Sequence, residues 1–482
     1  MSNVWKDLEP KEVFFYFEQI CNIPHGSGNV ERISNYLVDF AKERKLEYYQ
    51  DDLKNVIIIK EATAGYETEE PVIIQGHMDM VAVKKPDCEI DMKTEPLRPA
   101  IDGDNVYAEG TSLGGDDGIA VAYALALLNS DSIVHPRLEV VITVDEETGM
   151  DGARGIDLSM LKGHRLLNLD SEEEGFFLTS CAGGARVNCS LPLIRTLREG
   201  TLYEVTLTGL QGGHSGCEID KERGNSNVLF GRMLAECMTE DSFGLVGING
   251  GLADNAIPRE TTAELLVWEK EEAFEQAVRG FESKIKKELE SKEPDIQIIL
   301  KKREQTEKEV FSKNAAQAAV QLLVALPNGI QAMSLDVKGL VETSLNMGIV
   351  KTTQKEFQIE FSVRSSIESA KEALIDKVKV IAGLCGADSR VSGAYPGWAY
   401  RKDSPLRDKM VRVYREMYGK EPVIQAIHAG LECGLLAEKI ADLDCVSLGP
   451  DMKNIHTTEE TLSISSTKRV WDFCLEVLKQ RG

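Results

Sequence analysis

A histidine and an aspartate stand two residues apart at the end of an apolar stretch, VIIQGHMDMVAVK (residues 72–84). Side chains alternate between the two faces of a strand, so His77 and Asp79 are predicted to lie on the same face. A histidine there can bind a metal ion, and an aspartate can orient the imidazole through its other nitrogen. The pair alone favours a plainer interpretation, a histidine that caps a sheet edge beside an aspartate that stabilises a turn.

Further acidic residues and another histidine follow other apolar runs of the chain. Ionisable groups gathered at one edge of a sheet repel one another and lose hydration, unless a positive charge offsets both costs. A metal ion would do so, and mixed imidazole and carboxylate ligands favour zinc, cobalt or manganese over calcium or magnesium. The sequence therefore predicts a metal site in which two ions could share the carboxylate of Asp116. Its other ligands would be His77, Glu147, Asp170 and His456.

The adjacent acids Glu146 and Glu147 are expected to have different roles. Neighbouring residues at a strand end cannot both face one metal in the same way. Glu147 is therefore the expected ligand and Glu146 the expected acceptor of a proton from metal-bound water. Plainer interpretations exist, because DEET (145–148) could be an acidic helix N-terminus and GGDDG (114–118) a turn with an aspartate N-cap. Their joint occurrence in this order favours the metal site.

Strands alternate with helices in the N-terminal part of the chain. Apolar spacing predicts helices over 10–20 and 30–42, and the run 119–128, apolar nearly all round, predicts a buried helix. Strands are predicted at 55–59, 72–75, 137–144 and 164–170. This order predicts an α/β fold with a mixed, mostly parallel sheet and helices on both faces. Ligands of such sheets bind outside the carboxyl ends of the strands, where the predicted metal ligands stand.

A second kind of pattern begins near residue 185. Alternating polar strands, such as 202–210 and 356–366, are typical of an antiparallel sheet with one hydrated face. After about residue 387 the first pattern returns, and a length of 482 residues favours two domains. The sequence thus predicts a discontinuous catalytic domain, residues 1–184 and 388–482. An α+β lid domain, residues 185–387, would interrupt it, and its two strand-rich halves could be related.

Composition excludes several classes of partner. A formal net charge of −24 argues against nucleic acid and anionic membranes. The longest clearly apolar stretch, 119–128, is about half of a membrane span, and the N-terminal residues lack the apolar core of a signal peptide. Ten cysteines without a C-x-x-C pair are typical of reduced thiols. We therefore expect a cytoplasmic protein that binds neither nucleic acid nor membrane.

Five motifs together resemble those of the di-zinc exopeptidase family, which includes carboxypeptidases, aminoacylases and carnosine-cleaving dipeptidases. They are GHMDMV (76–81), GGDDG (114–118), DEETG (145–149), NLDSEEEG (168–175) and NIHTTEE (454–460). The resemblance implies two zinc ions per subunit, with cobalt or manganese possible. It implies His77 and Asp170 on one ion, Glu147 and His456 on the other, Asp116 bridging, Glu146 as general base and Asp79 orienting His77. The long lid is similar to that of the dipeptidase branch.

The same resemblance implies residues that contact the substrate. GGHSG supplies His214 for the oxyanion, GLADNAIP supplies Asn255, and SVRSS supplies Arg364 for the substrate carboxylate, for which a guanidinium is the usual bidentate partner. HAGLECG (428–434) resembles a glycine-rich substrate loop, with Gly430 and Glu432 as the residues of interest.

The expected function is metal-dependent hydrolysis of dipeptides of the Xaa-His or carnosine-like type, with broad specificity. The resemblance further implies a homodimer. One alternative is an N-acyl-amino-acid amidohydrolase with the same metals, against which the long lid argues. Another is a metal- and peptide-binding protein without turnover, against which the presence of Glu146 argues.

Overall fold

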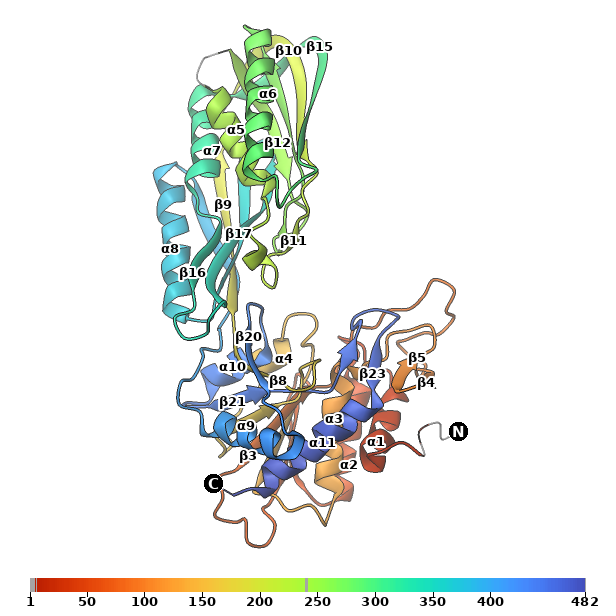
Figure 1. The fold of residues 1–482 in the computed structure, drawn as a ribbon. Helices are drawn as coiled ribbons and strands as arrows, with labels where there is room; N and C mark the ends of the chain where they lie inside the picture. Colours follow the sequence, from red (N-terminus) through yellow and green to blue (C-terminus); the bar gives the residue numbers. More distant parts are fainter. Residues whose placement is uncertain (1–4, 6, 239–241, 482) are drawn as a thin grey trace. The chain divides into compact units, whose positions relative to one another are not determined.

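The chain divides into two compact units, seen in the computed structural model of residues 5, 7–238 and 242–481 (Figure 1). The first unit comprises residues 1–180, 400–426 and 431–482, and the second comprises residues 181–399 and 427–430. Each unit has its own hydrophobic core. The roles of catalytic domain and lid, and the predicted boundaries at 184 and 388, stay predictions.

The described part of the first unit is built on an eight-stranded sheet. Its four central strands, β6, β3, β7 and β21, run parallel, whereas β1, β2 and β8 pair antiparallel at the two sides. This arrangement confirms the predicted mixed sheet. In spatial order the strands are β1 (Glu47–Gln50), β2 (Val56–Lys60), β6 (Leu138–Thr143), β3 (Val72–His77), β7 (Arg165–Asn168), β21 (Asp444–Ser447), β8 (Phe176–Cys181) and β20 (Val423–Ile427).

Helices cover both faces of this sheet. Alternate strand residues such as Val72 and Ile74 belong to the main core, whereas Ile73 and Gln75 point to the opposite face. On that opposite face Gln75 contacts Glu432, the first residue of α10. The helices of the unit are α1 (Lys11–Cys21), α2 (Glu31–Glu43), α3 (Gly115–Asn129), α4 (Asp151–Gly155), α9 (Pro405–Tyr418), α10 (Glu432–Lys439) and α11 (Ile464–Lys479).

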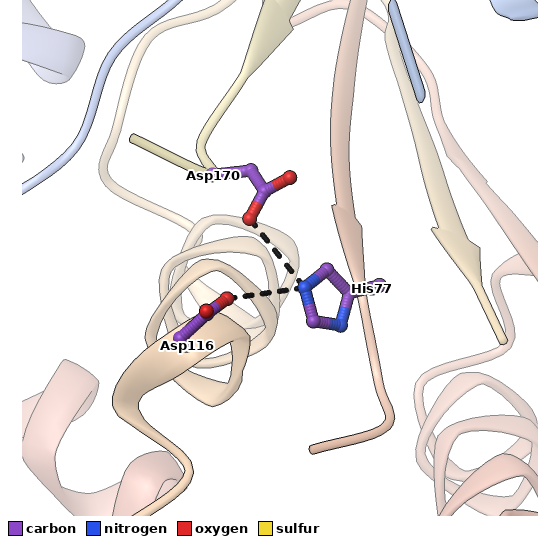
Figure 2. A group of neighbouring side chains, drawn as sticks. All are labelled: His77, Asp116 and Asp170. Carbon is purple, nitrogen blue, oxygen red and sulfur yellow. Dashed lines mark hydrogen bonds and ion pairs between the residues drawn. The ribbon is translucent and has the colours of Figure 1, made fainter. Parts of the chain in front are cut away.

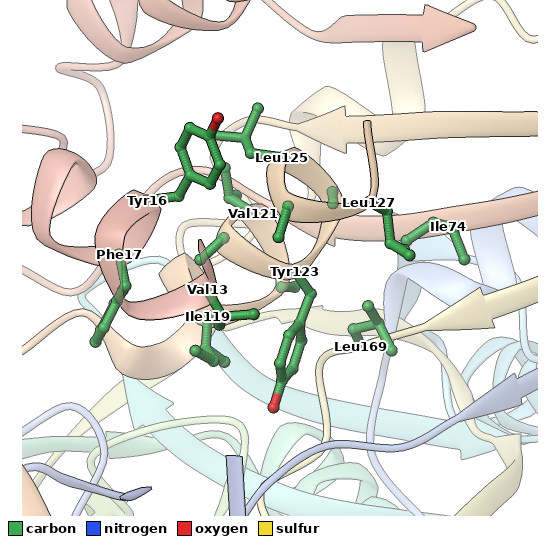
Figure 3. Packing of buried hydrophobic residues seen from close by; sticks show 14 of the residues in the cluster. Val13, Tyr16, Phe17, Ile74, Ile119, Val121, Tyr123, Leu125, Leu127 and Leu169 are labelled. Atoms are coloured by element: carbon green, nitrogen blue, oxygen red, sulfur yellow. The ribbon is translucent and has the colours of Figure 1, made fainter. Parts of the chain in front are cut away.

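Helix α3 lies at the centre of the main core. Nearly every one of its residues is buried, as its all-round apolar sequence predicts. Figure 3 shows its side chains packed among those of α1 and β3. Tyr123 stacks on Trp471 of α11 at 5.7 Å and donates a hydrogen bond to the carbonyl of Thr467. Because α3 is fixed on all sides, its N-terminus, where Asp116 lies, has a defined position at the carboxyl edge of the sheet.

A small four-stranded sheet also belongs to the first unit. Its order is β22 (Met452–Lys453), β23 (Thr461–Ser463), β5 (Asn105–Ala108) and β4 (Pro99–Asp102). The turn between β22 and β23 contains His456. The sheet therefore joins the late part of the chain to its early part, next to α3.

The described residues of the second unit form an antiparallel nine-stranded sheet. Four helices and the buried faces of the strands share one core, and strands such as β18 alternate buried and half-buried residues, as predicted. The sheet contains β15 (Gln297–Phe311), β10 (Arg195–Thr208), β14 (Thr261–Val267), β12 (Phe243–Gly250), β17 (Val341–Thr352), β18 (Glu356–Ser365), β9 (Gly183–Pro192), β19 (Asp388–Tyr395) and β16 (Gly329–Met333). The helices are α5 (Ser226–Cys237), α6 (Glu271–Glu288), α7 (Lys313–Ala325) and α8 (Glu368–Leu384), and β11 (Gly213–His214) pairs with β13 (Ala256–Ile257).

None of the described helices combines the length and apolar character that a bilayer-spanning segment needs.

Substitution of Phe17 by alanine is expected to destabilise the first unit by about 3–5 kcal/mol, because a fully buried ring is replaced by a cavity. Phe17 is 0% exposed and stacks on Trp5 at 5.3 Å. Urea unfolding followed by circular dichroism measures the loss. Phe15→Ala on the same helix is the control, since Phe15 is 53% exposed and its loss should stay within about 0.5 kcal/mol. Equal losses would contradict this packing.

Candidate metal centre

The carboxyl edge of the parallel strands gathers the predicted ligands. His77 is the last residue of β3, Asp170 lies two residues after β7, and Glu147 lies four residues after β6. Asp116 comes from the N-terminus of α3, and His456 from the turn between β22 and β23. Five segments far apart in the sequence therefore converge on one site within the first unit.

One half of the site forms around His77 (Figure 2). Its Nε2 atom lies 3.1 Å from Oδ1 of Asp116 and 3.4 Å from Oδ1 of Asp170. The imidazole is buried, and its other nitrogen faces away from these two carboxylates, toward Asp79. His77, Asp116 and Asp170 thus present three ligand atoms close enough to hold one ion.

The other half forms around His456. Its Nε2 atom lies 3.1 Å from Oδ2 of Asp116 and 2.9 Å from Oε2 of Glu147. Asp116, Glu147 and His456 therefore make a second group that could hold an ion. Asp116 belongs to both groups, with one carboxylate oxygen facing each imidazole. This is the arrangement of a carboxylate that bridges two ions.

The carboxylates of the site favour a positive charge at the Nε2 atoms of His77 and His456. Burial by itself lowers the pKa of His77, but Asp170, Asp116 and Asp79 raise it well above 6.5. Hydrogen bonds to Asp116 and Glu147 raise the pKa of His456 to about 10. Burial opposes ionisation of Asp116, yet the two imidazoles hold its pKa below the usual value. A proton or a metal ion on each imidazole would offset the negative charge of the carboxylates around it.

The donor set fits a divalent metal pair. Oε1 of Glu147 is buried and has no hydrogen-bond partner among the described residues, so this oxygen is available to bind a metal ion. Two imidazoles with three carboxylates suit zinc, cobalt or manganese, since calcium and magnesium prefer oxygen-only sites. The residues present therefore fit the ions that the sequence predicts.

Asp79 supports both His77 and Glu146. Nδ1 of His77 is 3.0 Å from the backbone carbonyl of Asp79 and 3.4 Å from its carboxylate, so the carbonyl is the nearer acceptor. The carboxylate accepts hydrogen bonds from the backbone N–H of Glu146 and from the hydroxyl of Ser27. Burial raises the pKa of Asp79, but these contacts lower it below its usual value overall. Asp79 thus orients an imidazole and fixes the Glu146 backbone at once.

The Glu146 carboxyl favours its protonated form more than a glutamate in water does. Burial raises its pKa well above the usual value. The positive charge of His77 opposes this shift, and the charges of Asp170, Glu432 and Glu147 add to it. A carboxylate in such surroundings accepts a proton readily, which is what a general base requires.

Glu460 is a residue of the site that sequence reasoning did not single out. Its carboxylate is buried and accepts hydrogen bonds from four consecutive backbone N–H groups, those of residues 113–116, at 2.7–3.3 Å. It thereby ties the His456 turn to the segment that carries Asp116. Its place four residues after His456, in the motif NIHTTEE, was the only signal.

Backbone geometry at three further positions belongs to the same site. A Cβ atom on Gly76 would lie 2.6 Å from Cβ of Ala120, so glycine permits α3 to approach β3. Asp117 follows Asp116 through a cis peptide bond and accepts a hydrogen bond from the backbone N–H of His77 at 3.1 Å. His456 has a left-handed backbone with φ of +61°, which is uncommon outside glycine and frequent at functional sites.

His214 lies in the second unit. Its Nδ1 atom accepts hydrogen bonds from the backbone N–H groups of Gly216 and Cys217, at 3.2 and 3.0 Å. Burial and the charge of Arg364 lower its pKa, so the imidazole is neutral and carries its proton on Nε2. That N–H group is therefore an uncharged hydrogen-bond donor.

Arg364, on β18, is buried near His214. No carboxylate of the described residues forms an ion pair with it, and its Nε atom has no hydrogen-bond partner there. A Cβ atom on Gly216 would lie 3.2 Å from Nε of Arg364 and 2.9 Å from Cε1 of His214. Both groups therefore converge on one glycine, and the guanidinium has hydrogen-bonding capacity for an anion.

The ring of Tyr395 leaves room only for glycine at position 430. Its hydroxyl accepts a hydrogen bond from Nη1 of Arg364 at 3.3 Å, and a Cβ atom on Gly430 would lie 2.8 Å from its ring. His428 is also buried here, and burial together with Arg364 lowers its pKa to about 3, so it stays neutral beside the guanidinium.

The other two predicted substrate residues, Asn255 and Glu432, lie in different units. Asn255 is exposed and lines a pocket of the second unit together with His214. Glu432 belongs to the first unit, where it is fully buried against the sheet. The structure thus brings the five predicted metal ligands together with Asp79 and Glu146, and separately groups His214, Arg364 and Gly430.

Metal content after exhaustive dialysis against zinc should be two ions per chain. Asp116→Ala is expected to lose both ions, because each group of ligands contains Asp116, whereas His456→Ala should retain one. Atomic emission spectroscopy measures the stoichiometry. His164→Ala is the control, because this exposed histidine lies outside both groups and should leave two ions bound. Retention of two ions by Asp116→Ala would contradict a shared carboxylate.

Comparison with known proteins supports the resemblance seen in the motifs. The sequence model of peptidase family M20/M25/M40 matches residues 73–480. The cytosol non-specific dipeptidase of Escherichia coli (strain K12) is 39% identical over 476 residues, which cover 98% of each chain. Aminoacylhistidine dipeptidase from Vibrio alginolyticus has a similar structure, with a TM-score of 0.95 and 38% identity, over 99% of this chain and 98% of that one.

Aminopeptidase PepT from Bacillus cereus, at 15% identity and a TM-score of 0.56 over 98% of both chains, shares the fold. The resemblance inferred from the five motifs is confirmed. With a family model that matches most of its length and a relative that is 39% identical from end to end, the chain belongs to peptidase family M20/M25/M40.

Proposed function

We propose that the protein is a dipeptidase that hydrolyses the peptide bond of dipeptides with two zinc ions per subunit. The observation that carries the proposal is the Asp116 carboxylate between two imidazoles, with the backbone of Glu146 hydrogen-bonded to Asp79, which also contacts His77. Similarity over nearly full length to a cytosol non-specific dipeptidase and to an aminoacylhistidine dipeptidase supports the same activity.

The two groups of ligands would each hold one zinc ion, His77 and Asp170 for the first, Glu147 and His456 for the second, with Asp116 shared. When bound, the ions supply Lewis-acid activation of the attacking water and of the substrate carbonyl. Cobalt or manganese could occupy the same ligands.

Glu146 is the proposed general base. Its raised pKa suits a group that takes a proton from the attacking water and returns it to the leaving amine. Asp79 contributes by fixing the Glu146 backbone and the His77 ring. A single carboxylate can perform both transfers, because the proton that it takes up in the first is the one that it releases in the second, which restores its charge.

Residues of the second unit are proposed to contact the substrate. The Nε2–H group of His214 would donate to the oxygen of the carbonyl under attack, where negative charge develops. Arg364 would bind the substrate carboxylate, which restricts hydrolysis to short peptides. Asn255 and Gly430 are proposed to line the substrate site.

The proposed substrates are dipeptides of broad sequence, including the Xaa-His type, as the names of the two relatives suggest, and the carnosine-like type that the motif resemblance implies. We further propose that the protein acts in the cytoplasm as a homodimer. An N-acyl-amino-acid amidohydrolase with the same metal site would instead prefer acylated amino acids to dipeptides in a direct comparison.

Glu146→Gln should lower kcat for dipeptide hydrolysis by about 10²–10⁴-fold while retaining both ions, because only the proton acceptor is lost. Amino-acid release and metal content of the same sample measure the two properties. Asp151→Asn is the control, since Asp151 is an exposed acid five residues later, at the start of α4, and the variant should retain full activity. Full activity of Glu146→Gln with both ions bound would rule out this mechanism.

Arg364→Ala should lower kcat/KM for dipeptides by about 10- to 100-fold, as expected for loss of a hydrogen bond to a charged group. The amidated analogue lacks the carboxylate, so its hydrolysis should change far less. Arg390→Ala, an exposed arginine on β19, provides the control. An equal loss for both substrates would argue against a role for Arg364 in carboxylate binding.

A further inference from the structure

A buried polar network lies beneath the candidate metal centre, on the α10 face of the sheet. It joins Glu432 at the start of α10 to one residue near the end of each of three neighbouring strands, β6, β3 and β7. Its members are Thr143, Gln75, Asn168 and Glu432, and all four are 0% exposed. Polar groups so deeply buried are costly unless they hydrogen-bond one another, so the network constrains the sheet at this place.

Glu432 is the acceptor at the centre of the network. Its Oε2 atom accepts hydrogen bonds from Nε2 of Gln75 and from the hydroxyl of Thr143, both at 2.6 Å. Nδ2 of Asn168 donates to Oε1 of Gln75, also at 2.6 Å. Three strands are thereby linked through side chains, in addition to the backbone ladder.

The network lies directly before the proposed ligands in the sequence. Gln75 precedes His77 by two residues and Asn168 precedes Asp170 by two residues. The strand period therefore places Gln75 on the same face as His77, one step deeper in the sheet. His77 also pairs in register with Thr143 of the neighbouring strand. A displacement of Gln75 or Asn168 would thus change the distance between His77 and Asp170.

Burial also argues against direct contact between Glu432 and a substrate. The carboxyl has no exposed surface, and its Oε2 atom is occupied by two donors from the sheet. Its second oxygen, Oε1, is buried without a partner among the described residues. Stability alone does not account for a carboxyl in such a place, since an apolar side chain of similar size would avoid the burial cost.

We propose that Glu432 is a positioning residue that, through Gln75, Thr143 and Asn168, fixes His77 and Asp170 at the separation that their metal ion requires. The proposal rests on the metal assignment of the proposed function and replaces the expectation that Glu432 contacts the substrate. Its effect is expected at the ion held by His77 and Asp170, because Gln75 and Asn168 each stand two residues before one of these ligands, whereas no member of the network stands so close before Glu147 or His456.

The test measures zinc affinity at one site at a time in the full-length protein, by competition with a chromophoric chelator. In a His456→Ala background the remaining site is that of His77, Asp116 and Asp170. Glu432→Ala should weaken zinc binding there by about 10- to 100-fold, the range typical of groups that orient metal ligands. In a His77→Ala background, which retains the site of Glu147 and His456, the same change should leave the affinity unaltered.

Two further variants distinguish positioning from a general loss of stability. Glu432→Gln keeps an acceptor for Gln75 and Thr143 and should restore most of the affinity. Glu139→Ala is the matched control, because Glu139 is an equally buried acid of the same strand, β6, that accepts the backbone N–H groups of Lys162 and Gly163. It should lower the melting temperature and leave the zinc affinity of both sites unchanged.

Three results would overturn the proposal. They are unchanged affinity in Glu432→Ala, an equal loss of affinity at both sites, and an equal loss in Glu139→Ala. A Glu432→Ala variant with normal zinc affinity and a raised KM would instead support contact with the substrate. Absence of zinc binding by the wild-type protein would overturn the proposed function itself, so the two failures are distinguishable. Thr143→Val, which removes one donor without altering Glu432, provides a milder change if Glu432→Ala does not fold.

Discussion

The site depends on one carboxylate that two imidazoles share. Asp116 directs one oxygen to His77 and the other to His456, so a small shift of its position weakens both contacts at once. Hydrogen bonds and metal coordination fall off steeply with distance. Asp116 must therefore be held from several directions, and much of the surrounding structure does this.

Three features fix this carboxylate in place. The buried helix α3 holds the segment from behind, the four N–H groups of residues 113–116 bind the Glu460 carboxylate, and Gly76 leaves room for close packing of α3 on β3. Glu460 also belongs to the segment that carries His456, so one contact positions residues from both ends of the chain. On the face of the sheet opposite α3, the Glu432 network lies next to the strand residues that precede His77 and Asp170.

The crowded negative charges of the site repel one another, and the same charges shift the pKa values of its imidazoles and of Glu146. Carboxylates at the sheet edge raise the pKa of both imidazoles, and together with burial they raise that of Glu146. Positive charge bound between them relieves this repulsion. A site that attracts divalent ions and keeps a basic carboxylate beside them is suited to hydrolysis by activated water.

The spacing of apolar residues along the chain predicted individual helices and strands and the faces that they bury. The all-round apolar run 119–128 is a buried helix, and the alternating strands of residues 202–210 and 356–366 have one buried face. The predicted ligands also lie together, because strand ends in a parallel sheet meet at one edge. Glu460 and the network of Glu432 were not predictable in this way. Their partners are more than 280 residues away, and such contacts leave no period or spacing in the sequence.

The most direct measurement of the central claim is anomalous X-ray diffraction at the zinc edge from crystals grown with zinc. The account predicts two peaks per chain, one among His77, Asp116 and Asp170 and one among Asp116, Glu147 and His456, with Asp116 in contact with both. A single peak, or two peaks without Asp116 between them, would contradict it.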